Sequence, residues 1–143
     1  MNDRTAKLRN AALMGAVVVF GVTILVFSLN MQLFPVAAAL AVIFGLLGVV
    51  IVVLTLRIQE PRLHRAFSLV TGISAAGIPI SVVLHNLVYA LCIVFFGEGF
   101  WQGSDEPFFF IMAILVFPAL FVIGVVGNSV LLIRAKMTKA NKE

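Results

Sequence analysis

Four apolar runs, each long enough to cross a lipid bilayer, constrain this sequence more than any other feature. They cover residues 11–29, 34–56, 66–96 and 107–133 and contain no lysine, arginine, aspartate or glutamate. A helix of about 20 residues spans the roughly 30 Å hydrocarbon core of a bilayer. A chain of 143 residues that is 62% hydrophobic and 11% charged has too little interior to hide this surface from water. The sequence therefore predicts an all-α integral membrane protein, a four-helix bundle forming a single transmembrane domain.

The first and third runs each allow a second interpretation. A cleaved signal peptide also begins with basic residues, but its apolar core has only about 7 to 15 residues, so we interpret residues 11–29 as a span. Residues 66–96 would extend about 46 Å as one helix, which exceeds the hydrocarbon core. We expect this helix either to tilt or to be kinked at Pro79, because proline lacks the N–H that the helix needs. Pro118 is expected to act as a second hinge, in the fourth run.

The charges predict an orientation for these spans. All ten lysines and arginines lie in residues 1–10, 57–65 and 134–143. The only charged residues of the loop 97–106 are acidic. Short loops rich in lysine and arginine stay in the cytoplasm. We therefore expect both termini inside the cell, residues 134–143 as a basic cytoplasmic tail, and the plasma membrane as the location. Because the basic residues are not interleaved with aromatic ones, we expect no nucleic-acid partner.

The loop 97–106 also contains predicted anchoring and capping residues. Phe100 and Trp101 have the character of side chains that sit at the membrane interface. Ser104 or Asp105 is predicted to cap the last helix, with Glu106 in its first turn.

Small and polar residues follow one face of the third run. They recur at a mean spacing of 3.5 residues, which places them on one helical stripe: Thr71, Ser74, Gly77, Ser81, His85, Tyr89 and Cys92. Such a face should point toward other helices, since polar groups are costly among acyl chains. Glycines in three runs are predicted to let helices approach closely: Gly45, Gly48, Gly77, Gly124 and Gly127.

His85 is the only imidazole in the apolar runs, and two interpretations of it remain open. In one, His85, Asn86 and Tyr89 form hydrogen bonds between helices, together with Ser81 and Ser74. In the other, these residues line a pathway, and His85, which can change charge between pH 5 and 8, relays protons or binds a solute. The absence of a carboxylate within any run favours the first interpretation, because His85 would then have no acidic partner. Asn128, near the end of the fourth run, is interpreted as a polar group at a helix end.

The residues exclude several activities. The single cysteine, Cys92, rules out a disulfide within the chain. His64 and His85 would lie about 31 Å apart on one helix, too far to share a metal ion, so we expect no metal site and no cofactor. No catalytic constellation is visible, and enzymatic activity would require a poorly marked lipid or quinone chemistry near Pro79.

These observations favour a non-catalytic subunit, assembly factor or scaffold, embedded in the lipid bilayer and bound to copies of itself or to another membrane protein. The alternative is an oligomeric transporter or channel subunit for a small solute or ion, whose pathway follows the polar face of residues 66–96.

Overall fold

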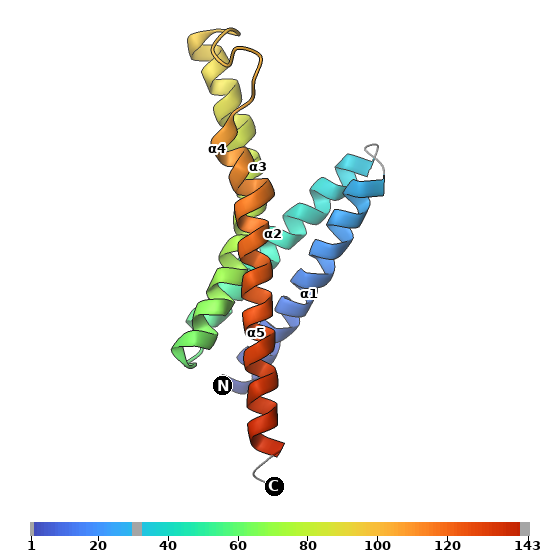
Figure 1. Ribbon diagram of the computed structural model, residues 1–143, viewed down its shortest axis with the longest axis vertical. Coiled ribbons are helices and arrows are strands. Elements are labelled where there is room, and N and C mark those ends of the chain that lie inside the picture. The colour runs from blue at the N-terminus through green and yellow to red at the C-terminus, as the bar shows by residue number, and fades with distance from the viewer. Residues whose placement is uncertain (1, 30–32, 141–143) are drawn as a thin grey trace.

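A computed structural model of the chain describes residues 2–29 and 33–140, and all the regular secondary structure in these ranges is helical, with no strand. The helices are α1 (Asn2–Leu29), α2 (Phe34–Leu56), α3 (Arg62–Phe96), α4 (Pro107–Ile111), the π-helical turn η2 (Met112–Val116) and α5 (Phe117–Ala140) (Figure 1). The last three follow one another without a break and form one long rod. Four helical segments are long and apolar enough to cross a membrane. The predicted all-α class and the four apolar helices are thus confirmed.

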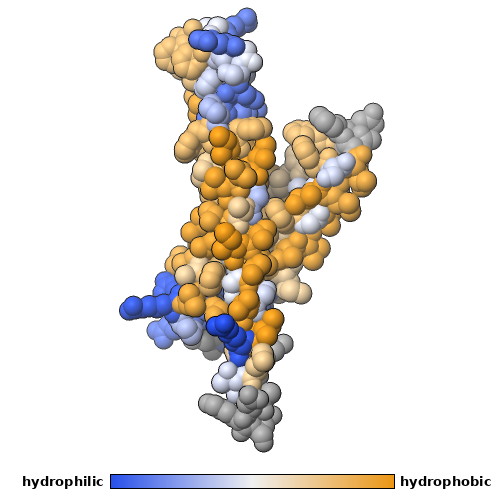
Figure 2. Space-filling model, viewed as in Figure 1, coloured by the Kyte–Doolittle hydropathy of each residue, from blue (hydrophilic) through white to orange (hydrophobic). Residues whose placement is uncertain are grey.

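The helices form two antiparallel hairpins that diverge from each other. One consists of α1 and α2, the other of α3 with α4 and α5, and α2 packs against α3 to join them (Figure 1). Both ends of the chain and the connection between α2 and α3 lie at one end of the molecule, which we call the basic end. The opposite end carries the loop Gly97–Glu106, which we call the acidic loop. Apolar side chains cover the middle of both hairpins, and the most hydrophilic residues lie toward the ends (Figure 2).

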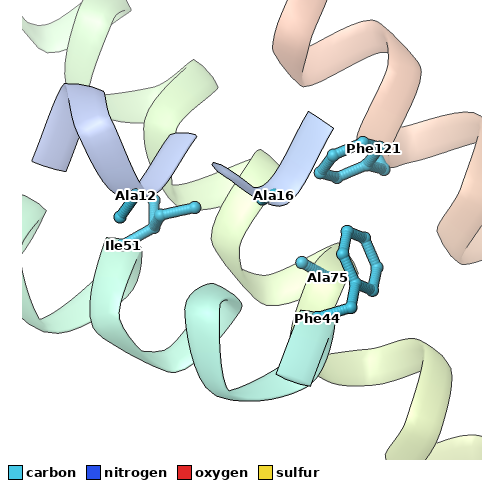
Figure 3. Packing of buried hydrophobic residues seen from close by; sticks show 6 residues of the cluster. All are labelled: Ala12, Ala16, Phe44, Ile51, Ala75 and Phe121. Atoms are coloured by element: carbon cyan, nitrogen blue, oxygen red, sulfur yellow. The ribbon is translucent and has the colours of Figure 1, made fainter. Parts of the chain in front are cut away.

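Three phenylalanines connect the hairpins at their crossing. The ring centroids of Phe20, Phe44 and Phe121 lie 4.9 to 5.4 Å apart, so α1, α2 and α5 meet at one point. Phe44 and Phe121 belong to one buried cluster with Ala12, Ala16, Ile51 and Ala75. The two rings lie near each other with Ala75 beside Phe44, whereas Ala12 and Ile51 lie together away from the rings (Figure 3). The core that joins the two hairpins is therefore narrow.

Glycines set how closely the helices approach. A methyl group on Gly48 would lie 2.6 Å from the backbone nitrogen of Ala76 and from the backbone oxygen of Gly72. A methyl group on Gly45 would lie 2.6 Å from the Pro79 ring. The backbones of α2 and α3 thus touch where the hairpins cross, a contact that only glycine permits.

The other three predicted packing glycines lie between α3 and α5. Gly124 faces the Thr71 hydroxyl, Gly127 faces a phenylalanine ring on α3, and Gly77 faces a phenylalanine ring on α5, each too closely for a methyl group to fit without movement. All five glycines therefore lie against a neighbouring helix.

The two prolines differ in their local structure. α3 continues as one helix through Pro79. Pro118 is the second residue of α5, one residue after the π-helical turn η2. A wider turn of this kind is one way for a helix to accommodate a residue that has no N–H to donate.

Three of the four apolar runs lie in helices that extend beyond them, whereas α2 has the same bounds as its run. α1 begins at Asn2, and an ion pair between Asp3 and Lys7, 3.0 Å apart, supports its first turns. α5 continues to Ala140, so most of the predicted basic tail is helical. Most of the predicted turn at residues 30–33 lies outside the described residues.

Candidate functional site

The polar stripe of α3 faces α5 over its first half. Thr71, Ser74 and Ser81 are buried, and so is Gly77, which contacts the Phe117 ring of α5. Side chains of the same protein therefore cover this part of the stripe, as is expected of a surface at which helices pack.

A buried hydrogen-bond network crosses from α3 to α5. Asn128 is only 3% exposed; its Oδ1 accepts a hydrogen bond from the Ser68 hydroxyl at 3.0 Å. Its Nδ2 donates to the Thr71 hydroxyl at 3.3 Å and to the backbone oxygen of Gly124 at 3.0 Å. The interpretation of Asn128 as a polar group at a helix end was wrong. Its position in the run suggested a helix end, but Ser68 and Thr71 on the facing helix satisfy its amide deep within the protein.

We expect Asn128→Ala to lower the free energy of unfolding by about 1 to 2 kcal/mol. Interhelical hydrogen bonds in membranes contribute about 0.6 kcal/mol each, with a maximum near 1.7. The matched control is Ser129→Ala, because that exposed hydroxyl donates only to the backbone oxygen of Val125 in its own helix. Denaturant titration in detergent should separate the two variants, and equal stabilities would contradict the network.

His85 lies in the second half of α3, between two carboxyl groups. Its Nδ1 is 3.0 Å from the backbone oxygen of Glu106 and 3.2 Å from Oε2 of the same residue. Its Nε2 is 3.4 Å from Oδ2 of Asp105, and the imidazole lies against the Phe110 ring at a centroid distance of 5.6 Å. The expectation that His85 has no acidic partner was wrong, because the acidic loop folds back onto α3 and supplies two.

Glu106 also caps the helix that follows it. Its two carboxylate oxygens accept hydrogen bonds from the backbone N–H groups of Phe108 and Phe109, each at 2.9 Å. The prediction that Ser104 or Asp105 caps this helix was therefore wrong by one or two residues, since the N-cap is Glu106. Asp105 instead accepts from the backbone N–H of Glu106 at 2.9 Å and turns its other oxygen toward His85. Pro107 has no N–H to offer, so the longer Glu106 side chain reaches over it to the next two donors.

The remaining candidates near His85 have different partners. The Tyr89 ring stacks on Trp101 at a centroid distance of 6.0 Å, and the Trp101 indole N–H donates to the backbone oxygen of Tyr89 at 3.3 Å. Phe100 packs edge-on against Trp101. Asn86 is exposed and donates to the backbone oxygen of Val82 in its own helix, so the structure does not bring it to the cluster. The aromatic residues thus hold the acidic loop against the end of α3.

A second charged cluster lies at the basic end and was not predicted. Arg9 is 1% exposed; its guanidinium forms an ion pair with Glu60, and it donates to the Asn10 side chain at 2.9 Å. His64 approaches the same Glu60 carboxylate at 3.3 Å. Arg9 looked like one of several basic residues that orient the chain, and only its distant partner Glu60 distinguishes it.

An apolar groove of about 340 Å³ lies between α2 and α3, beside the contact of Gly45 with Pro79. Its lining residues are Val42, Gly45, Leu46, Val49, Ala76, Pro79, Ile80, Val83 and Leu84. No polar side chain is among them, so the groove suits a hydrocarbon surface and offers nothing to bind the polar head of a quinone or a lipid.

The described parts of the chain contain no group of three or more histidine, cysteine, aspartate or glutamate side chains arranged to hold a metal ion. The two ring nitrogens of His85 face different carboxyl groups, in opposite directions. Comparison of the chain with protein families, with curated proteins and with solved structures gives no match.

Proposed function

We propose that this protein is a non-catalytic subunit, assembly factor or scaffold of the plasma membrane, with four spans and both termini in the cytoplasm. The basic end then faces the cytoplasm and the acidic loop faces outward, in agreement with the distribution of lysine and arginine. The proposal includes association with a second copy or with another membrane protein.

The observation that carries this proposal is that buried polar groups pair with one another inside the chain. Asn128 bonds to Ser68 and Thr71, and Arg9 pairs with Glu60. The glycines of α5 close the space beside the polar stripe of α3. A solute pathway needs polar groups that face a cavity, whereas these groups face other side chains of the same protein.

The narrow contact between the two hairpins supports the proposal that the protein binds a partner. They meet over a narrow core and separate toward the acidic loop, leaving the α2–α3 groove open. Leu46 and Val83 on its two walls are 61% and 64% exposed. A transmembrane helix from another polypeptide would cover this groove through close packing of apolar side chains, which is how helices associate in membranes.

One observation favours the transport alternative. His85 has two carboxyl groups beside it, a combination that occurs in proton relays. Proteoliposomes that contain a pH-sensitive dye test this alternative directly. Proton flux that is lost in His85→Ala, while folding in detergent is retained, would favour a transporter; absence of flux in the unaltered protein would favour the subunit.

The proposed orientation gives a separate expectation. In a Cys92→Ala background, Ser104→Cys should react with a membrane-impermeant maleimide on intact cells, and Thr138→Cys should react only after the cells are opened. Both positions are exposed on the protein, so accessibility depends on the side of the membrane. Labelling of both cysteines from outside would overturn the orientation.

Purification in mild detergent from cells that express the tagged chain at its natural level tests the subunit role. We expect a complex of fixed stoichiometry, either with a second membrane protein or with further copies, measured by native mass spectrometry. A monomer without a partner would contradict the proposal.

A further inference from the structure

We propose that the contact between His85 and the acidic loop depends on a proton: the loop is held to α3 when the imidazole is doubly protonated, and its Asp105 contact is lost when His85 becomes neutral. This inference concerns the loop itself and does not depend on what the protein binds. It rests on the positions of the atoms around the two ring nitrogens.

The first nitrogen must carry hydrogen in either charge state. Nδ1 faces the backbone oxygen of Glu106 at 3.0 Å, and a carbonyl oxygen only accepts hydrogen bonds. The nearby Oε2 of Glu106 accepts a hydrogen bond from a backbone N–H, which is consistent with an ionised carboxylate. The neutral form of His85 is therefore the tautomer with its hydrogen on Nδ1.

In that tautomer the other ring nitrogen, Nε2, has an unfavourable contact with Asp105. Without a hydrogen, Nε2 directs its lone pair at Oδ2 of Asp105, 3.4 Å away. Two hydrogen-bond acceptors, Nε2 and Oδ2, then face each other. When Nε2 also carries a proton, the same two atoms form an ion pair. Asp105 has a side chain that is 61% exposed, so the proton can exchange with the aqueous phase beside the loop.

The side chains that face the imidazole of His85 include two carboxyl groups, Asp105 and Glu106, both from the acidic loop. Tyr89 and Cys92 are the titratable residues further along its own helix. The sequence contains no lysine or arginine between residues 66 and 133, so no cationic side chain of these segments competes for the two carboxylates.

The only tryptophan reports on this contact. Trp101 belongs to the acidic loop and stacks on Tyr89, one helical turn beyond His85. Movement of Asp105 away from α3 should loosen this stack and expose the indole to a water-soluble quencher. Quenching of Trp101 fluorescence by acrylamide, measured on the whole protein in detergent, therefore reports whether the acidic loop lies against α3.

We expect quenching to rise with pH in a single one-proton transition, because the contact with Asp105 is lost when Nε2 of His85 loses its proton. His85→Gln should abolish the transition. His64→Gln, which removes the only other histidine, should preserve it. A transition that persists in His85→Gln, or one that disappears in His64→Gln alone, would overturn the proposal.

A second variant keeps the test decisive if His85→Gln does not fold. Asp105→Asn replaces the opposing oxygen with an amide that can donate a hydrogen bond to neutral Nε2. Quenching should then stay at its low-pH value across the whole range. A pH profile of Asp105→Asn that equals that of the unaltered protein would also contradict the inference.

Discussion

Glu60→Gln should lower the free energy of unfolding by about 3 to 5 kcal/mol, the cost of removing one partner from a buried ion pair. Arg9 is 1% exposed, and Glu60 is the carboxylate that compensates its charge. A guanidinium cannot lose its proton to escape this cost. The variant should therefore leave an uncompensated cation between α1 and the α2–α3 connection, measured by denaturant titration in detergent.

The control for this variant is Glu98→Gln, which neutralises an exposed carboxylate in the acidic loop. We expect a change below about 0.5 kcal/mol, as for most surface substitutions. The double variant Arg9→Met with Glu60→Gln should recover much of the lost stability, because it removes the buried cation together with its partner. If Glu60→Gln proved as stable as Glu98→Gln, Arg9 would have to be solvated rather than buried.

Gly48→Ala should destabilise the protein by about 3 kcal/mol, near the upper end of the cost of overpacking. The added methyl group would lie 2.6 Å from backbone atoms of both Gly72 and Ala76. Backbone atoms cannot rotate away as a side chain can, so α2 and α3 must separate along their whole contact.

Gly21→Ala is the matched control, because nothing lies within 4 Å of a methyl group at that position of α1. Alanine is also the better helix former, so this variant should be as stable as the unaltered protein or slightly more so. Equal stability of Gly48→Ala and Gly21→Ala in thermal unfolding would show that the two hairpins do not cross as closely as described.

The helices could be predicted from the sequence because hydrophobicity along the chain determines them. Each apolar run lies within a helical segment. α1 begins nine residues before its run, where Asp3 pairs with Lys7. The spacing of small and polar residues likewise depends only on helical periodicity, and three of the residues that it places on one face, Thr71, Ser74 and Ser81, are buried.

The charged and polar clusters could not be predicted because they depend on pairing between distant segments. The partner of Arg9 is 51 positions away, and the partners of His85 are about 20 positions away across a loop whose path the sequence does not determine. Two glycines with positive φ, Gly97 and Gly103, and the stacking of Trp101 on Tyr89 set that path. Periodicity identifies a face of a helix, but it carries no information about which side chain of another segment meets it.

We propose that another polypeptide covers the α2–α3 groove in the membrane. Photo-crosslinking in native membranes tests it most directly, with a benzophenone amino acid at Leu46 in the groove and, as a control, at Leu25, which is 57% exposed on α1 outside the groove. We expect a discrete protein adduct from Leu46, either to a second copy or to one partner, and lipid adducts alone from Leu25. Lipid adducts alone from Leu46 would contradict the account.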